Sequence, residues 1–201
     1  GNFSPIGSPT HPFKGTFDGN NAEFILDINR SAEHYQALFG YLEIGTIKNL
    51  SVKGSVFGND YVAGVLAYLA SGTVENVYNL ANVRSNDDYA AGIVGYAISG
   101  TINQAYNDGD VLADDDYAGG IVSRIQGSTA NKVYISNTYN SGEILGIQYV
   151  GGLVGYVLGT SSNRYSEISF SYSSGLVSGN GNVGGVLGYY VSSANKRTHI
   201  Y

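Results

Sequence analysis

The sequence predicts an all-β protein folded as a parallel, right-handed β-helix (a β-solenoid) of about six to seven coils. Three observations carry this prediction. A segment of roughly 30 residues recurs along the chain. Each copy contains short runs rich in β-branched and aromatic residues, separated by Gly, Asn, Ser and Asp, which supply turns. Tyrosines recur at the same places in successive copies, and no stretch combines a helical period with capping residues.

Residues 1–34 form a lead-in that differs from the copies after it. This part is rich in phenylalanine and contains the turn string PFKGTFDGNN. We interpret residues 12–30 as an extra leading coil, with the residues before it as an entry loop or cap. The terminal coil of a solenoid must be covered, because otherwise it exposes the edge of a sheet.

Residues 35–201 hold six copies of the repeat, and we expect the last copy to be truncated. The shared core of the copies reads YQALFGY, YVAGVLAY, YAAGIVGY, YAGGIVSR, YVGGLVGY and NVGGVLGY. A second block follows each core, as in GTIKNLSVKGSV, GTVENVYNLANV and GTINQAYNDGDV. These units are shorter than the 40 or more residues of a propeller blade, so each copy fits one coil of a single solenoid domain. Its interior is expected to be built from Val65, Ile93, Ile121, Leu153 and Val186.

Stacked coils place equivalent residues about 4.8 Å apart in columns. Most of the 18 tyrosines fall in three such columns. Column one is Tyr35, Tyr61, Tyr89, Tyr117 and Tyr149; column two is Tyr41, Tyr68, Tyr96, Tyr156 and Tyr189, with Arg124 in one copy; column three is Tyr78, Tyr106, Tyr139 and Tyr172, with Ser51 in the first copy. Tyrosine use is therefore architectural.

Two further columns consist of small or amide residues. Glycines align at Gly64, Gly92, Gly120, Gly152 and Gly185, which indicates close backbone packing or a required positive φ. Asn49, Asn76, Gln104 and Asn137 form an amide column at a bend, which Phe170 interrupts in the fifth copy.

The amino-acid composition argues against several classes of protein function. The chain contains no Cys, which excludes a disulfide framework, a cysteine zinc cluster and a thiol nucleophile. A net charge of −6 with scattered Lys and Arg argues against nucleic acid as a partner. The most apolar runs are too short and too rich in glycine for a membrane span. The N-terminus has no signal-peptide pattern, and we interpret the chain as a piece of a longer protein.

The alternation of YVGGLVGY-type cores with GTIKNL-type blocks resembles the GLUG-motif repeats of bacterial extracellular proteins. The similarity covers about residues 12–191 and extends to the lead-in PFKGTFDGNN. Such regions occur in IgA-cleaving zinc metallopeptidases and in adhesin-like proteins, but the metallopeptidase motif HExxH is absent here. The resemblance thus implies a β-solenoid segment, located extracellularly or at a bacterial cell surface, without peptidase activity.

The sharpest candidate for a cofactor is calcium. Asp60, Asp88 and Asp116 each precede a column-one tyrosine, so stacking brings their carboxylates close enough to repel one another. A bound Ca²⁺ would relieve this repulsion, with Asp88, Asp115 and Asp116 as the candidate ligands and Asp87 as a further one. The alternative is a solvated turn in which Asp is simply a good turn residue. We favour solvated turns and therefore expect no cofactor.

The candidate binding residues are Tyr78, Tyr106, Tyr139 and Tyr172, the third tyrosine column. Ile47, Leu50 and Val52 are the apolar positions of their strand in the first copy, which suggests that Ser51 and the aligned tyrosines point outward. An exposed aromatic strip offers flat faces and hydroxyls to a surface glycan or to a partner protein of the host or the bacterium. The alternative is a ladder that stabilises the coils and binds nothing.

An enzyme is the remaining alternative, because parallel β-helices also cleave polysaccharides. Such chemistry needs two carboxyls at a set separation in a groove, whereas the acids here belong to a repeated turn. The departures from the repeat are Arg124 and the long turns at residues 127–132 and 159–164. We therefore expect a non-catalytic surface segment that acts as an adhesion module or a stiff spacer, with no catalytic residues.

Overall fold

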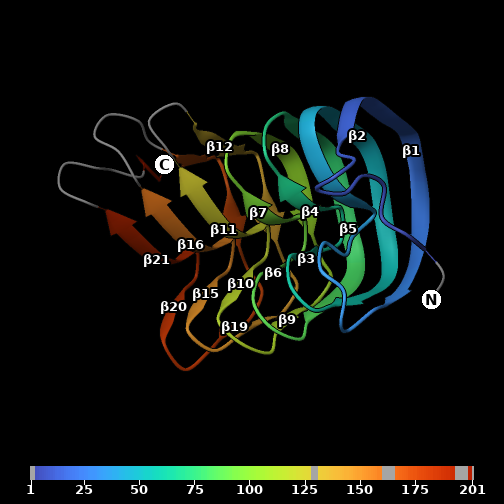
Figure 1. The fold of residues 1–201 in the computed structure, drawn as a ribbon. Coiled ribbons are helices and arrows are strands. Elements are labelled where there is room, and N and C mark those ends of the chain that lie inside the picture. Colours follow the sequence, from blue (N-terminus) through green and yellow to red (C-terminus); the bar gives the residue numbers. More distant parts are fainter. Residues whose placement is uncertain (1–2, 128–130, 160–165, 193–198, 201) are drawn as a thin grey trace.

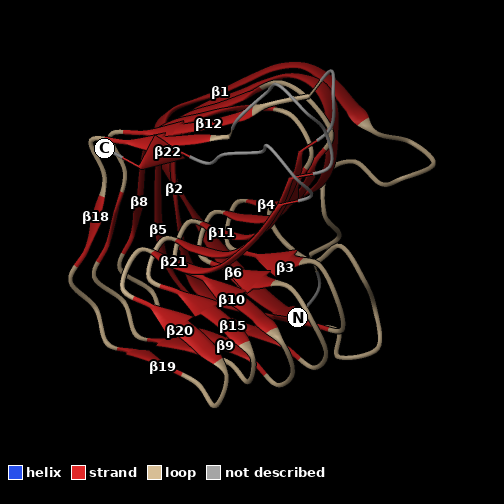
Figure 2. Ribbon diagram, turned by 90° about the vertical axis from the view of Figure 1, so that its left-hand side faces the viewer, coloured by secondary structure: helices blue, strands red, loops and turns tan. Residues whose placement is uncertain are grey.

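The computed structural model describes residues 3–127, 131–159, 166–192 and 199–200. The chain winds into coils that stack side by side from the N-terminal end to the C-terminal end (Figure 1). Viewed along the stack, successive coils superimpose into one cross-section, with a long wrapped sheet and a short sheet beside it (Figure 2). Among the described residues, no helix has the length and apolar character needed to cross a membrane.

The described residues form two sheets, one of 17 strands and one of 5. The large sheet contains β1 (Phe13–Asn29), β2 (Phe39–Gly58), β4 (Leu66–Leu69), β5 (Thr73–Ser85), β7 (Val94–Ala97), β8 (Gly100–Asn107), β9 (Val111–Ala113), β11 (Val122–Gly127), β12 (Val133–Ser136), β13 (Tyr139–Asn140), β14 (Ile144–Leu145), β16 (Val154–Gly159), β17 (Glu167–Ser169), β18 (Tyr172–Ser173), β19 (Val177–Ser178), β21 (Leu187–Ser192) and β22 (His199–Ile200). The small sheet contains β3 (Val62–Ala63), β6 (Ala90–Ala91), β10 (Tyr117–Gly119), β15 (Tyr149–Gly151) and β20 (Asn182–Gly184).

The strands pair in parallel, and equivalent residues of successive copies face each other. Tyr68 pairs with Tyr96, and Tyr106 pairs with both Tyr78 and Tyr139. The all-β parallel solenoid expected from the repeat is thus confirmed. The stack has about five turns, fewer than the six to seven expected. The terminal coils explain the difference, because the small sheet has strands from only five copies and β1 has no counterpart in it.

The interior is a continuous apolar stack. Val65, Ile93, Ile121 and Leu153 are fully buried, as the sequence predicts. Val186 is only partly buried, because no described coil lies beyond it. At the N-terminal end, Phe13, Phe17 and Phe24 pack against the core, and the Phe17 ring lies 5.1 Å from that of Phe39.

The amide column lies at a bend, as expected. Its members adopt positive φ angles, from 48° at Asn76 to 56° at Asn49, and Asn tolerates this left-handed conformation. Asn76 Nδ2 donates a hydrogen bond to Asn49 Oδ1 (2.8 Å), and Asn49 Nδ2 donates to Asp18 Oδ1 (3.0 Å). Phe170 keeps the bend with a φ of 49°, but its side chain is 79% exposed.

The glycine column makes room for a second, buried amide ladder. A Cβ added at Gly64 would lie 2.1 Å from Asn79 Oδ1, and one added at Gly92 would lie 2.1 Å from Asn107 Oδ1. Close packing, and not a positive φ, therefore explains Gly64, Gly92, Gly120 and Gly152, whereas a Cβ added at Gly185 would have nothing within 4 Å. The two asparagines and Asn140 are fully buried and are linked from coil to coil by hydrogen bonds of 2.6–2.7 Å.

Candidate functional site

The third tyrosine column forms an outward-facing strip, which we call the tyrosine strip (Tyr78, Tyr106, Tyr139 and Tyr172). Tyr78 lies between the buried residues Val77 and Asn79 on β5, so the alternation of a strand directs its ring away from the core. Tyr106 and Tyr139 are half-buried by their neighbours, and Tyr172 is 59% exposed. The four rings therefore follow one another along the outer face of β5, β8, β13 and β18.

At its C-terminal end the tyrosine strip is a regular stack of rings. At its N-terminal end the ring of Tyr78 is rotated out of that stack. The rings of Tyr106 and Tyr139 lie 4.8 Å apart at 27°, and those of Tyr139 and Tyr172 lie 5.6 Å apart at 16°. Tyr78 is tilted by 60° against Tyr106. Its hydroxyl donates to a carboxylate oxygen of Asp108 and lies 2.9 Å from the hydroxyl of Tyr139. These two bonds, the one to Asp108 above all, raise the pKa of Tyr78.

A pocket opens where the strip ends. It has a volume of about 320 Å³ and lies beside Ser51, the residue that replaces tyrosine in the first copy. Its lining combines aromatic, apolar and amide groups: Asn21, Leu50, Ser51, Asn76, Val77, Tyr78, Tyr106 and Tyr139. Three of the four sequence-predicted binding residues thus line one pocket, and the fourth, Tyr172, continues the stack away from it.

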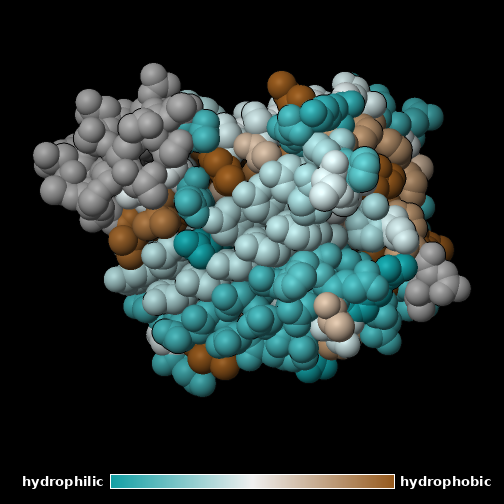
Figure 3. Space-filling view, in the orientation of Figure 1, coloured by the Kyte–Doolittle hydropathy of each residue, from teal (hydrophilic) through white to brown (hydrophobic). Residues whose placement is uncertain are grey.

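Columns one and two of the tyrosines form a second aromatic surface, over β4, β7, β11 and β16. Within each column the rings stack, with Tyr61 4.9 Å from Tyr89 and Tyr68 5.2 Å from Tyr96. Between the columns the rings meet edge to face, as Tyr89 and Tyr96 do at 86°. This surface forms a continuous pale band in the space-filling view (Figure 3). Because these rings stack tightly on one another, we interpret the tyrosines of columns one and two as residues that stabilise the coils.

Arg124 interrupts this surface without disrupting it. Its guanidinium carbon lies 5.3–5.6 Å from the centroids of four tyrosine rings, and its Nη1 donates to the hydroxyl of Tyr89 at 2.6 Å. A cation over aromatic faces is attracted by their quadrupoles, so Arg124 takes the place of a ring in the stack. The other departures from the repeat, the turns at residues 127–132 and 159–164, fall partly outside the described residues.

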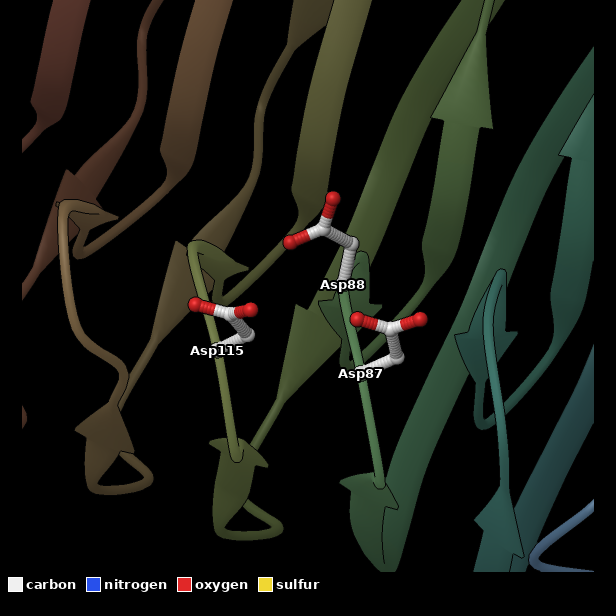
Figure 4. Close-up of side chains that lie close together, drawn as sticks. All are labelled: Asp87, Asp88 and Asp115. Atoms are coloured by element: carbon white, nitrogen blue, oxygen red, sulfur yellow. The ribbon is translucent and has the colours of Figure 1, made fainter.

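The aspartates before column one form an acidic turn cluster. Asp87, Asp88 and Asp115 come from two neighbouring turns and each offers an oxygen within 4.8 Å of the others (Figure 4). Burial raises the pKa of Asp60 to about 7, with the charges of Asp88 and Asp87 adding to it. Burial likewise raises the pKa of Asp88 to about 6.

The third sequence-predicted calcium ligand lies beside this cluster and not in it. The backbone N–H of Asp116 donates to Asp88 Oδ1 (3.1 Å), while its own side chain is absent from the group of three. Asp87, considered as a further ligand, is in the group. A calcium ion requires six to eight oxygens, and the described residues bring only three carboxylates together here. The favoured interpretation remains a solvated turn, and a calcium titration tests the alternative.

Asp108 is a site residue that the sequence reasoning missed. It follows Tyr106 by two positions and is the first residue after the end of β8. Its carboxylate accepts hydrogen bonds from Tyr78 and from Ser141 of the next coil. Its position two residues after a tyrosine of column three is the sequence feature by which Asp108 could have been found.

Comparison with known proteins gives one partial similarity. No protein-family model matches the sequence, and no solved structure matches it. A segment of Halomucin from Haloquadratum walsbyi (strain DSM 16790 / HBSQ001) is 37% identical over 91 residues, which is 43% of this chain. The chain spans about 1% of the length of that relative.

Proposed function

We propose that this chain is a non-catalytic solenoid module of an extracellular, cell-surface protein, and that it binds carbohydrate along the tyrosine strip. The observation that carries the proposal is the pocket of about 320 Å³, into which three tyrosines of the strip contribute their rings. The resemblance to GLUG-motif repeats supports the surface location, and the stiffness of a stacked solenoid suits a module that presents a binding face.

The chemistry of the strip matches that of a sugar. A pyranose ring presents C–H groups on its faces and hydroxyls around its rim. Tyrosine rings offer flat apolar faces to the former, while the amides of Asn21 and Asn76 in the pocket lining can accept hydrogen bonds from the latter or donate to them. Tyr106, Tyr139 and Tyr172 are already ordered by stacking, so little side-chain entropy is lost on binding.

A glycan array probed with the purified chain tests this proposal. We expect binding to a defined set of oligosaccharides, and a loss of that binding in Tyr106→Ser and Tyr139→Ser. Tyr134→Ser is the matched control, because Tyr134 is 40% exposed but does not line the pocket. Each variant should remain folded, because Tyr106 and Tyr139 each form cross-strand aromatic pairs with two neighbours in the strip, at about 0.2–1 kcal/mol a pair.

Two results would count against carbohydrate binding. An array without any specific signal would leave a stiff spacer as the role of the chain. Equal binding by Tyr139→Ser and the control would move the binding face away from the strip.

A further inference from the structure

The tyrosine strip lacks one ring at its N-terminal end. Ser51 on β2 occupies the column-three position next to Tyr78, and Glu23 of β1 pairs with Ser51 in the coil beyond. Neither residue continues the aromatic stack. The pocket lies at this vacant position, since Ser51 and its neighbour Leu50 form part of its lining. The pocket thus borders the position at which a further stacked ring would lie.

An insertion in the first coil contributes to the wall of the pocket. Residues 19–21 of β1 stand opposite the single residue Asn49 of β2, because the register shifts between Asp18 and Ala22. Asn20 and Asn21 adopt φ angles of 50° and 59°, and Asn21 is the first-coil residue that lines the pocket. Asp18 Oδ1 fixes the insertion, since it accepts hydrogen bonds from the Asn20 backbone and the Asn49 side chain. At the far end of the strip, Tyr172 is 59% exposed, and the described residues form no insertion beside it.

The ring next to the vacancy is turned out of the stack. Tyr78 is held by Asp108 and by the hydroxyl of Tyr139, both of which lie on its C-terminal side. These bonds draw its hydroxyl toward the later coils and away from Ser51. The pocket therefore borders three tyrosines, Tyr78, Tyr106 and Tyr139. At the end of a regular ladder it would border only the first ring.

We propose that the pocket takes the terminal ring of a neutral glycan, in the place of the tyrosine missing at Ser51, while the rest of the glycan extends over Tyr106, Tyr139 and Tyr172. This inference rests on the proposed carbohydrate binding. It adds that the site recognises the end of a glycan chain and not its middle. The amides of Asn21 and Asn76 are placed to meet the hydroxyls of the terminal ring. The lining contains no cationic group, and the neighbouring carboxylate of Asp108 opposes an acidic sugar.

The decisive variant is Ser51→Tyr, which fills the vacancy with the residue found at the same position in the next four coils. It should fold, and its melting temperature should equal or exceed that of the wild type. Ser55→Tyr is the matched control, because Ser55 is exposed on the same strand but does not line this pocket. Calorimetry with cellohexaose, chitohexaose and maltohexaose should show binding at least ~10-fold weaker for Ser51→Tyr and unchanged for Ser55→Tyr.

Saturation-transfer NMR on the bound hexasaccharide gives an independent readout. In the wild type, the protons of one terminal ring should receive the largest transfer, and Ser51→Tyr should abolish that preference. Hexasaccharide binding that is lost in Tyr139→Ser but unchanged in Ser51→Tyr would overturn the terminal-ring site and leave the proposed function standing. Absence of wild-type binding both to these hexasaccharides and on the glycan array would overturn both.

Discussion

The buried asparagine ladder should contribute a large part of the stability of the solenoid, and Asn107 is the place to test it. Its side chain makes three hydrogen bonds while fully buried: it accepts from Asn79 Nδ2 (2.6 Å) and donates to Gly109 O (2.8 Å) and Asn140 Oδ1 (2.7 Å). At about 1 kcal/mol for each bond, Asn107→Ala loses about 3 kcal/mol. The buried polar atoms left without that partner raise the expected loss to about 3–5 kcal/mol. For a chain of this length, this lowers the melting temperature by roughly 6–20 °C.

The assay is urea unfolding followed by circular dichroism, with amide hydrogen exchange to locate the loss. Protection should fall first in the coils that carry Asn79, Asn107 and Asn140, because each coil of a solenoid is stabilised mainly by its neighbours. Asn82→Ala is the control, because Asn82 is exposed on the strand next to that of Asn107 and accepts one hydrogen bond, from the backbone N–H of Asp110 (3.3 Å), so that its loss should cost at most about 1 kcal/mol. A loss below about 1 kcal/mol for Asn107→Ala would refute the reasoning, since solvent would then satisfy the same groups equally well.

Three further predictions concern the glycine column and the acidic turns. Gly92→Ala should lower the melting temperature by at least about 4 °C, because the added Cβ would lie 2.1 Å from Asn107 Oδ1. Gly185→Ala is the control and should leave the melting temperature nearly unchanged, because a Cβ added there would have no atom within 4 Å. Since the folded-state pKa of Asp60 is about 7 and that of Asp88 about 6, both above the ordinary value of 3.8 for Asp, the stability that these two carboxyls contribute should be complete below about pH 4 and be lost as the pH rises to about 7. The urea midpoint should accordingly be higher at about pH 5 than at about pH 8, and Asp60→Asn should flatten this dependence; equal midpoints in the wild type would mean that both carboxylates are solvated. Melting temperatures in EDTA and in millimolar calcium should agree within about 2 °C if the turns are simply solvated, and a larger rise with calcium would instead identify a metal site.

Much of the architecture could be predicted from the sequence because parallel stacking repeats one environment many times. The alignment of Tyr106 with Tyr139, the outward direction of Ser51 and the bend at Asn76 all follow from equivalent positions in the copies. The number of turns did not follow, because the repeat count does not show that the terminal copies form incomplete coils. The sequence also left open whether the glycine column reflected close packing or a positive φ.

The interior amides were missed for a local reason. Asn107 and Asn140 each follow a tyrosine and stand two residues before a glycine, a setting that is typical of a turn. Their burial depends on strand alternation continuing through that position, which turn composition obscures. The turned ring of Tyr78 was equally hidden, because it depends on the position of the Asp108 carboxylate in the following coil.

A repeated fold offers nearly the same surface in every coil, so a ligand bound to that surface alone could slide along it by one coil at little cost in free energy. Specificity for one position requires a break in the repeat. The described residues show two breaks that meet at one point: the missing ring at Ser51 and the insertion that ends in Asn21. Each alone would be ordinary drift between copies, but together they form a bounded pocket at the end of an aromatic strip. Restoring the ring at Ser51 removes one break and keeps the rest of the strip, so the variant tests whether the break, and not the repeat, confers recognition.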